Sequence, residues 1–156
     1  PPRSTLFPYT TLFRSEEEKK IVRAHINGSF SKPAPVIDTD KIIKARELVK
    51  QVYVDERIEQ YIADIVFATR YPENYKLASL KDYISCGGSP RASINLALAA
   101  RACAFIKRRG YVVPEDVREV ATDVLRHRIG LSYEAEASNL KADDIIKEIL
   151  NKVEVP

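Results

Sequence analysis

The sequence predicts an all-α protein, a small helical bundle. Apolar residues recur at three- and four-residue intervals in several stretches, as on the buried face of a helix. No stretch alternates polar and apolar residues for any length, as a half-buried strand would. The 156 residues, 45% of them hydrophobic and 30% charged, are enough for one domain with a core.

The first half of the chain predicts three helices. Residues 16–25 begin with acids and end with bases, which suits the helix dipole. Pro33 and Pro35 mark a loop, and Asp38 or Thr39 can cap the next helix. That helix has an apolar stripe of Ile42, Ala45, Val49 and Val52, and a second one, from Asp55 to Tyr71, has Ile58, Ile62, Ile65, Val66 and Thr69. Joined by a tight link, these two helices should pack antiparallel.

The second half predicts a central helix flanked by shorter ones. Residues 74–85 are ambiguous and suggest a turn of helix. Residues 90–109 are rich in alanine and leucine and apolar around most of the helix, so they should lie centrally and stop at Gly110. A brief extended piece and Pro114 then open an amphipathic helix, and a last helix follows from residue 143. Their inward positions are Val117, Val120, Ala121, Val124 and Leu125, then Ile145, Ile146, Ile149 and Leu150.

The stretch Cys-Gly-Gly-Ser-Pro-Arg-Ala places a cation in the first turn of the central helix. Ser89 suits the N-cap and Pro90 the first helical position, so Arg91 adds charge to the positive end of the dipole. An anion bound there would relieve the conflict, and Gly87 and Gly88 would let the backbone approach it. The alternative, favoured on this stretch alone, is a solvated Arg91 beside a neighbouring carboxylate.

Other chemistry finds little support. The sequence has no phosphate-binding loop, no paired acids after a strand and no nucleophile elbow. His25 and His127 lack metal-ligand spacing, and no metal site is predicted. Cys86 and Cys103 are expected to be free thiols. The basic run 126–128 suits the C-terminal end of a helix dipole, and Glu134 and Glu136 suit a solvated face.

Composition bounds the setting of the chain. A formal charge of +3 does not by itself indicate nucleic acid, and no membrane span or export signal is apparent, so the cytoplasm is expected. The sequence lacks methionine and is expected to be a fragment. Residues 1–15 resemble a translated sequencing adapter; an ordinary disordered tail is the alternative, and both predict poor packing.

The stretches 87–129 and 131–137, taken together, resemble the C-terminal lid of the MoxR group of AAA+ ATPases. The match continues upstream through 52–73 and downstream to the C-terminal residues 143–156. The resemblance implies that residues 16–37 are a helix and linker from the end of an AAA+ core, and that residues 38–156 are the helical lid.

The resemblance also implies roles for residues. Arg91 matches the sensor 2 arginine of the Gly-Ala-Ser-Pro-Arg-Ala motif, which reaches the phosphates of ATP bound with Mg²⁺ in the core. Gly87, Gly88, Ser89 and Pro90 would form the rest of that contact. The parent protein is then an ATP hydrolase and chaperone-like remodelling factor, and this chain, without Walker motifs, should be inactive alone. The implied partners are the AAA+ core, further copies in a ring and a von Willebrand factor A domain protein, without membrane or nucleic acid.

The sequence departs from the family pattern at two positions. Gly88 stands where the motif usually has Ala, which adds backbone freedom. Val113 replaces the usual Thr before Pro114, so that helix loses a side-chain cap typically worth about 1 kcal/mol. Neither change touches Arg91.

Two rival functions remain open at this stage. One is a stand-alone helical interaction module with a solvated Arg91; an in-frame phosphate loop upstream would exclude it. The other is a small nucleic-acid-binding domain, whose affinity should fall steeply with salt. Its contacts would come from Arg101, Lys107, Arg108, Arg109, Arg126 and Arg128.

Overall fold

The computed structural model describes residues 15–28 and 34–156 of the chain. The predicted tail therefore lies, except for Ser15, outside the described residues. The chain divides into two compact units between Asp38 and Thr39. Each unit is described by itself.

In the first unit the described structure is dominated by one helix, α1 (Ser15–Ile26). Glu16, Glu17 and Glu18 lie in its first turn, and Arg23 and His25 in its last. The acids thus lie at the positive end of the helix dipole and the bases at its negative end, which is the favourable order that the sequence predicted.

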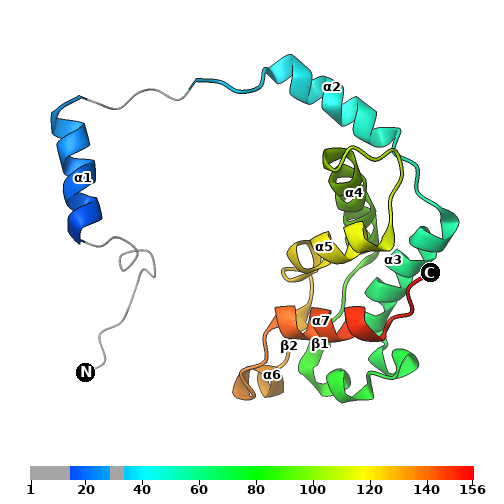
Figure 1. Ribbon diagram of the computed structural model, residues 1–156. Coiled ribbons are helices and arrows are strands. Elements are labelled where there is room, and N and C mark those ends of the chain that lie inside the picture. The colour runs from blue at the N-terminus through cyan, green and yellow to red at the C-terminus, as the bar shows by residue number, and fades with distance from the viewer. Residues whose placement is uncertain (1–14, 29–33) are drawn as a thin grey trace, which may run out of the picture. The chain divides into compact units, whose positions relative to one another are not determined.

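The second unit is a helical bundle with one short sheet, which confirms the all-α prediction (Figure 1). Its elements follow in order: α2 (Thr39–Lys50), α3 (Glu56–Arg70), the 3-10 helices η2 (Pro72–Tyr75) and η3 (Ala78–Tyr83), β1 (Ile84–Cys86), α4 (Pro90–Ile106), α5 (Pro114–Leu125), β2 (Gly130–Leu131), α6 (Tyr133–Ala137) and α7 (Ala142–Lys152).

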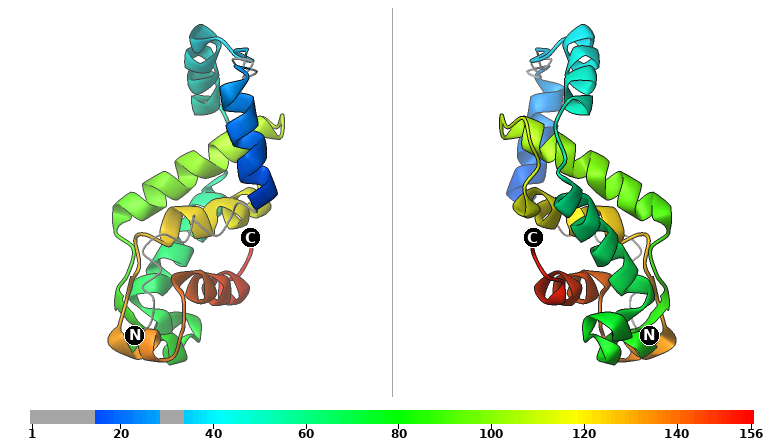
Figure 2. Two further views of the ribbon diagram at one scale, coloured as in Figure 1. Left: turned by 90° about the vertical axis from the view of Figure 1, so that its left-hand side faces the viewer. Right: turned by 90° about the vertical axis from the view of Figure 1, so that its right-hand side faces the viewer.

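Helix α4 is central, as predicted, and contacts α2, α3 and α5 (Figure 2). Small residues on its buried face let the neighbouring helices approach closely. The α7 helix closes the core against α3 and α5 with four buried aliphatic side chains. The fully buried positions of α4 are Ala92, Leu96, Ala100 and Ala104, and those of α7 include Ile145 and Ile146.

The expected antiparallel packing of α2 on α3 is wrong. Helix α2 contacts α4 instead and has no buried residue. The link between α2 and α3 explains the difference, because Tyr53 forms a parallel bridge with Tyr111 in the loop after α4. Two backbone hydrogen bonds hold it: the Tyr53 N–H donates to the Gly110 carbonyl at 2.9 Å and the Val112 N–H to the Tyr53 carbonyl at 3.0 Å.

The ambiguous residues 74–85 form 3-10 helix and then strand β1. This strand pairs antiparallel with β2, Ile84 opposite Leu131 and Cys86 opposite Gly130. Strands of three and two residues are too short to show alternation, and for this reason they could not be predicted from the sequence. The pair lies at the end of the unit where α4 begins (Figure 2).

Helix α4 ends earlier than predicted, at Ile106 rather than Arg109. The residue with left-handed backbone is Arg108, with φ of 59°, and not Gly110. The Arg109 N–H donates to the Ala104 carbonyl at 2.9 Å and so satisfies one of the last carbonyls of the helix.

Candidate functional site

Arg91 lies in the first turn of α4, and its side chain is exposed. That turn contains no acidic residue. The Arg91 side chain forms no hydrogen bond or ion pair with any residue of the second unit. The neighbouring carboxylate of the alternative interpretation is therefore not found within the second unit. The conflict between guanidinium and helix dipole is real and is not relieved within the described fold.

Ser89 occupies the N-cap position with extended backbone, φ −79° and ψ 170°, but its side chain accepts no capping hydrogen bond. Pro90 is the first residue of the helix, as predicted. The Ala92 N–H donates to the Ser89 carbonyl at 2.7 Å. The first turn of α4 thus presents backbone N–H groups that Ser89 does not cap.

The end of α3 holds the two glycines before this turn. The buried Thr69 hydroxyl accepts the Gly88 N–H at 2.8 Å and donates to the Val66 carbonyl at 2.6 Å. A Cβ on Gly87 would lie 2.6 Å from the Thr69 carbonyl oxygen, so only glycine permits this approach. At Gly88 a Cβ would meet the Ala92 Cβ at 3.2 Å, and Ala would fit only after a small shift.

A second arginine borders the same turn. The Arg70 side chain passes beside Gly87, and its guanidinium lies 4.5 Å from the centre of the Phe67 ring. Its Nε is buried and has no hydrogen-bond partner among the described residues. Sequence reasoning missed both Thr69 and Arg70 as parts of this turn. Thr69 was assigned to an apolar stripe, and no local pattern links it to a glycine nineteen residues away.

Exposed apolar residues follow Arg91 along the same face of α4. Ile94 and Leu98, three and seven positions after Arg91, are 58% and 51% exposed. Because these spacings bring side chains to one helix face, an exposed cation and two exposed aliphatic side chains form a single stripe.

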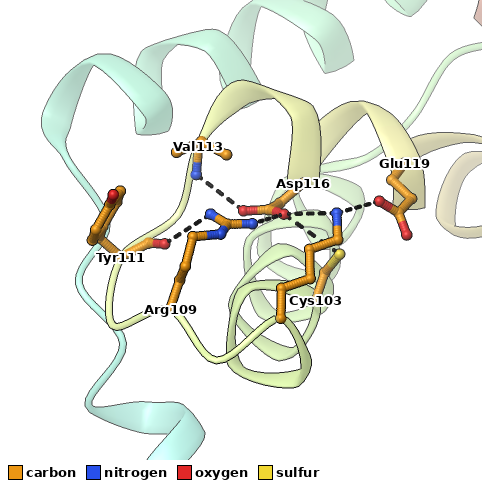
Figure 3. A network of polar contacts seen from close by, with 7 residues as sticks. Cys103, Arg109, Tyr111, Val113, Asp116 and Glu119 are labelled. Carbon is orange, nitrogen blue, oxygen red and sulfur yellow. Dashed lines mark hydrogen bonds and ion pairs between the residues drawn. The ribbon is translucent and has the colours of Figure 1, made fainter.

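The other polar centre is Asp116, which is fully buried. Figure 3 shows the polar contacts around it. Its Oδ2 accepts the Val113 N–H at 3.1 Å, and its Oδ1 accepts from Arg109 and, at 3.2 Å, from Lys107. Lys107 also binds Glu119. Val113 has no side-chain acceptor, as predicted, and Asp116 supplies the return half of a capping box.

These contacts set the charge states around Asp116. Burial alone would raise the Asp116 pKa, but the hydrogen bonds from Arg109, Val113 and Lys107 outweigh it and lower the pKa from 3.8 to about 2. Burial raises the pKa of the Cys103 thiol, with the negative charge of Glu119 acting in the same direction. Both cysteines are free thiols, as predicted; the buried Cys103 is expected to be unreactive.

Three cations of the alternative nucleic-acid surface are already paired. Lys107 and Arg109 bind Asp116, and Arg126 binds Asp123 at 2.9 Å and Asp143 at 3.4 Å. Arg126 follows directly after α5, in keeping with a cation at the C-terminal end of a helix. These ion pairs leave a weaker basic patch than the sequence suggests.

The residues that the structure describes contain neither a membrane-spanning helix nor a cluster of metal ligands. No helix there is long and apolar enough to cross a bilayer. No group of three or more His, Cys, Asp or Glu side chains there could hold a metal ion. Glu134 and Glu136 are exposed on α6. The N–H of Glu134 itself and the Ser132 hydroxyl lower the Glu134 pKa, so this carboxylate stays charged at neutral pH.

Comparison with known proteins decides the family. Residues 78–149 match the AAA lid domain. Chaperone MoxR1 of Mycobacterium tuberculosis is 32% identical over 151 residues, which are 97% of this chain and 40% of that protein. The chain therefore contains an AAA lid domain of the MoxR type.

Further relatives of the lid domain agree. Protein MoxR of Paracoccus denitrificans is 40% identical over 79 residues, covering 48% of this chain and 23% of that protein. A crystal structure of a Cytophaga hutchinsonii protein described as an ATPase superposes with a TM-score of 0.81 at 40% identity, covering 92% of this chain and 44% of that one. The chain thus spans less than half the length of these relatives.

Proposed function

We propose that this chain is the nucleotide-sensing lid of a MoxR-type AAA+ ATPase and that Arg91 is its sensor 2 arginine. The observation that carries the proposal is the exposed, unpartnered guanidinium of Arg91 at an N-terminus that Ser89 does not cap. Backbone N–H groups, the helix dipole and the cation all favour the same ligand, an anion. In this proposal the anion is a phosphate group of ATP.

The ligand would come from another protein surface. Arg91 is exposed, and the stripe it forms with Ile94 and Leu98 is suited to contact with a second domain. That domain would be the AAA+ core, which would hold ATP and Mg²⁺ and supply the hydrolytic groups. Gly87, Gly88, Ser89 and Pro90 would position the contact, and ATP binding or hydrolysis would move the lid as a rigid body.

The wider context follows from the relatives and is equally a proposal. A relative named as a chaperone supports a remodelling role for the intact protein. AAA+ membership supports assembly into a ring of identical subunits, with a von Willebrand factor A domain protein as partner and the cytoplasm as location. On its own the chain should not hydrolyse ATP.

The test is to measure ATP turnover in the intact ATPase containing this lid. Arg91→Ala should slow turnover by roughly a hundredfold, because a charge-assisted contact to the transition state is lost. Arg91→Lys should retain part of the activity. Arg46→Ala, which removes another exposed arginine, is the matched control and should have no effect. Unchanged turnover in folded Arg91→Ala protein would refute the sensor assignment.

A further inference from the structure

We infer that Thr69 is the positioning residue of the proposed sensor: its hydroxyl, at the end of α3, fixes the turn from which Arg91 projects. This inference rests on the proposed function of Arg91. It adds a residue that touches no ligand and acts through the backbone of Gly88.

The hydroxyl of Thr69 is fully used. The side chain is 1% exposed, donates to the Val66 carbonyl at 2.6 Å and accepts the Gly88 N–H at 2.8 Å. The bond to Val66 sets the direction of the hydroxyl proton, so a lone pair remains aimed at Gly88. Since Gly88 is buried as well, water cannot easily replace this acceptor.

The backbone of Thr69 lies close to Gly87, the residue before Gly88. Its carbonyl oxygen lies 2.6 Å from the position that a Gly87 Cβ would occupy, which shows how closely the turn is pressed onto α3. One residue of α3 therefore contacts both glycines, through its carbonyl oxygen at Gly87 and its hydroxyl at Gly88. The turn has little freedom to slide along the helix end.

The path from Thr69 to Arg91 is short. Ser89 follows Gly88 as the N-cap residue of α4, but the Ser89 side chain makes no capping hydrogen bond. The Thr69 hydroxyl thus provides a buried side-chain hydrogen bond that anchors the entry to α4 onto α3. The direction of the first turn, and with it the origin of the Arg91 side chain, depends on this anchor. Small displacements of this kind weaken a contact that must be placed within a fraction of an ångström.

A purely structural role is the alternative, because Thr69 also satisfies a buried N–H. The two roles differ in how they combine with loss of Arg91. A positioning residue acts only through Arg91, so its removal should change nothing further once Arg91 is absent. A structural residue should lower activity by the same factor in either background.

The experiment is a double-mutant cycle in the intact ATPase, read as the ATP concentration for half-maximal turnover and as the maximal rate. Thr69→Val keeps the shape and removes the hydroxyl. It should raise the half-saturating ATP concentration by roughly three- to tenfold, the loss of one neutral hydrogen bond. Thr69→Ser should restore most of that loss. In the Arg91→Ala background, Thr69→Val should have no further effect.

Two additional variants keep the test interpretable. Thr122→Val, the same chemical change within α5, removes a hydroxyl with no hydrogen bond to the described residues and should leave ATP turnover unchanged. If Thr69→Val does not fold, Thr69→Ala, which leaves room for a water beside Gly88, takes its place in the cycle.

The outcomes separate this inference from the proposed function. If Arg91→Ala itself leaves turnover unchanged, the sensor assignment fails and the role of Thr69 falls with it. If Arg91→Ala impairs turnover but folded Thr69→Val does not, only the positioning role is overturned. Equal effects of Thr69→Val with and without Arg91 would likewise overturn it, in favour of a structural role.

Discussion

The Asp116 carboxylate accepts the Val113 N–H at 3.1 Å and at the same time neutralises Arg109 in the loop before it. One buried acid thereby caps α5 and fastens the chain that leads into it. Asp116→Asn should lower the free energy of unfolding by roughly 2 to 3 kcal/mol, since Arg109 and Lys107 lose their shared anion. Denaturant titration of the chain measures this. Asp123→Asn, which removes an exposed pair with Arg126, should cost less than about 0.5 kcal/mol.

The same carboxylate predicts a dependence of stability on acid. Folding lowers the Asp116 pKa from 3.8 to about 2, so the unfolded chain binds this proton more readily. The contribution, about 2 kcal/mol, is therefore complete above pH 4 and is lost as the pH falls toward 2. The stability difference between the wild type and Asp116→Asn should narrow over that window. Curves that stay parallel from pH 6 to pH 2 would contradict the assignment.

Starts of helices were predictable from the sequence because their chemistry is local. Asp55 caps α3 by accepting the Arg57 N–H at 3.0 Å, and Pro90 and Pro114 stand at first helical positions. The candidate turn was found for the same reason. Its glycines, proline and arginine are neighbours in the chain, and the conflict between Arg91 and the dipole needs no tertiary information.

Features that depend on distant residues were not predictable. Helix α2 packs on α4 because Tyr53 meets Tyr111, and the partner of Gly88 is Thr69. Neither pairing leaves a periodic trace in the sequence. The sequence predicted that α4 would stop at Gly110, because glycine is common just after a helix end, yet Arg108 adopts the left-handed backbone there. Hydrogen bonding to the helix end outweighs that local preference.

A substitution at Gly87 tests how closely the turn before α4 lies against the end of α3. Gly87→Ala would place a Cβ 2.6 Å from the Thr69 carbonyl oxygen and from the Arg70 Cγ, so the turn must shift. We expect a loss of about 1 to 3 kcal/mol in the free energy of unfolding, measured by denaturant titration. Gly110→Ala is the matched control, because nothing lies within 4 Å of a Cβ there. Equal stabilities of the two variants would argue against the close approach.

Val113 is a position at which a substitution should stabilise the fold. Its backbone is extended, with φ −118° and ψ 161°, as at an N-cap, but its side chain cannot accept a hydrogen bond. Val113→Thr keeps the shape and adds an acceptor for the first turn of α5. The melting temperature should rise, because the added cap should increase the free energy of unfolding by up to about 1 kcal/mol. Val113→Ala, which removes methyl groups without adding an acceptor, should lower it.

Arg91 should trade stability against function. In the chain alone the guanidinium adds positive charge to the N-terminal end of α4 and has no partner among the described residues. Arg91→Glu should therefore raise the free energy of unfolding by about 0.3 to 1 kcal/mol at low salt, and less at high salt. In the intact ATPase the same variant should be more damaging than Arg91→Ala, because a carboxylate repels the phosphate it would face. A variant that is both more stable and less active would show that the arginine is kept for an anion outside this domain. Lower stability of Arg91→Glu in the chain alone would mean instead that the guanidinium is bound within it.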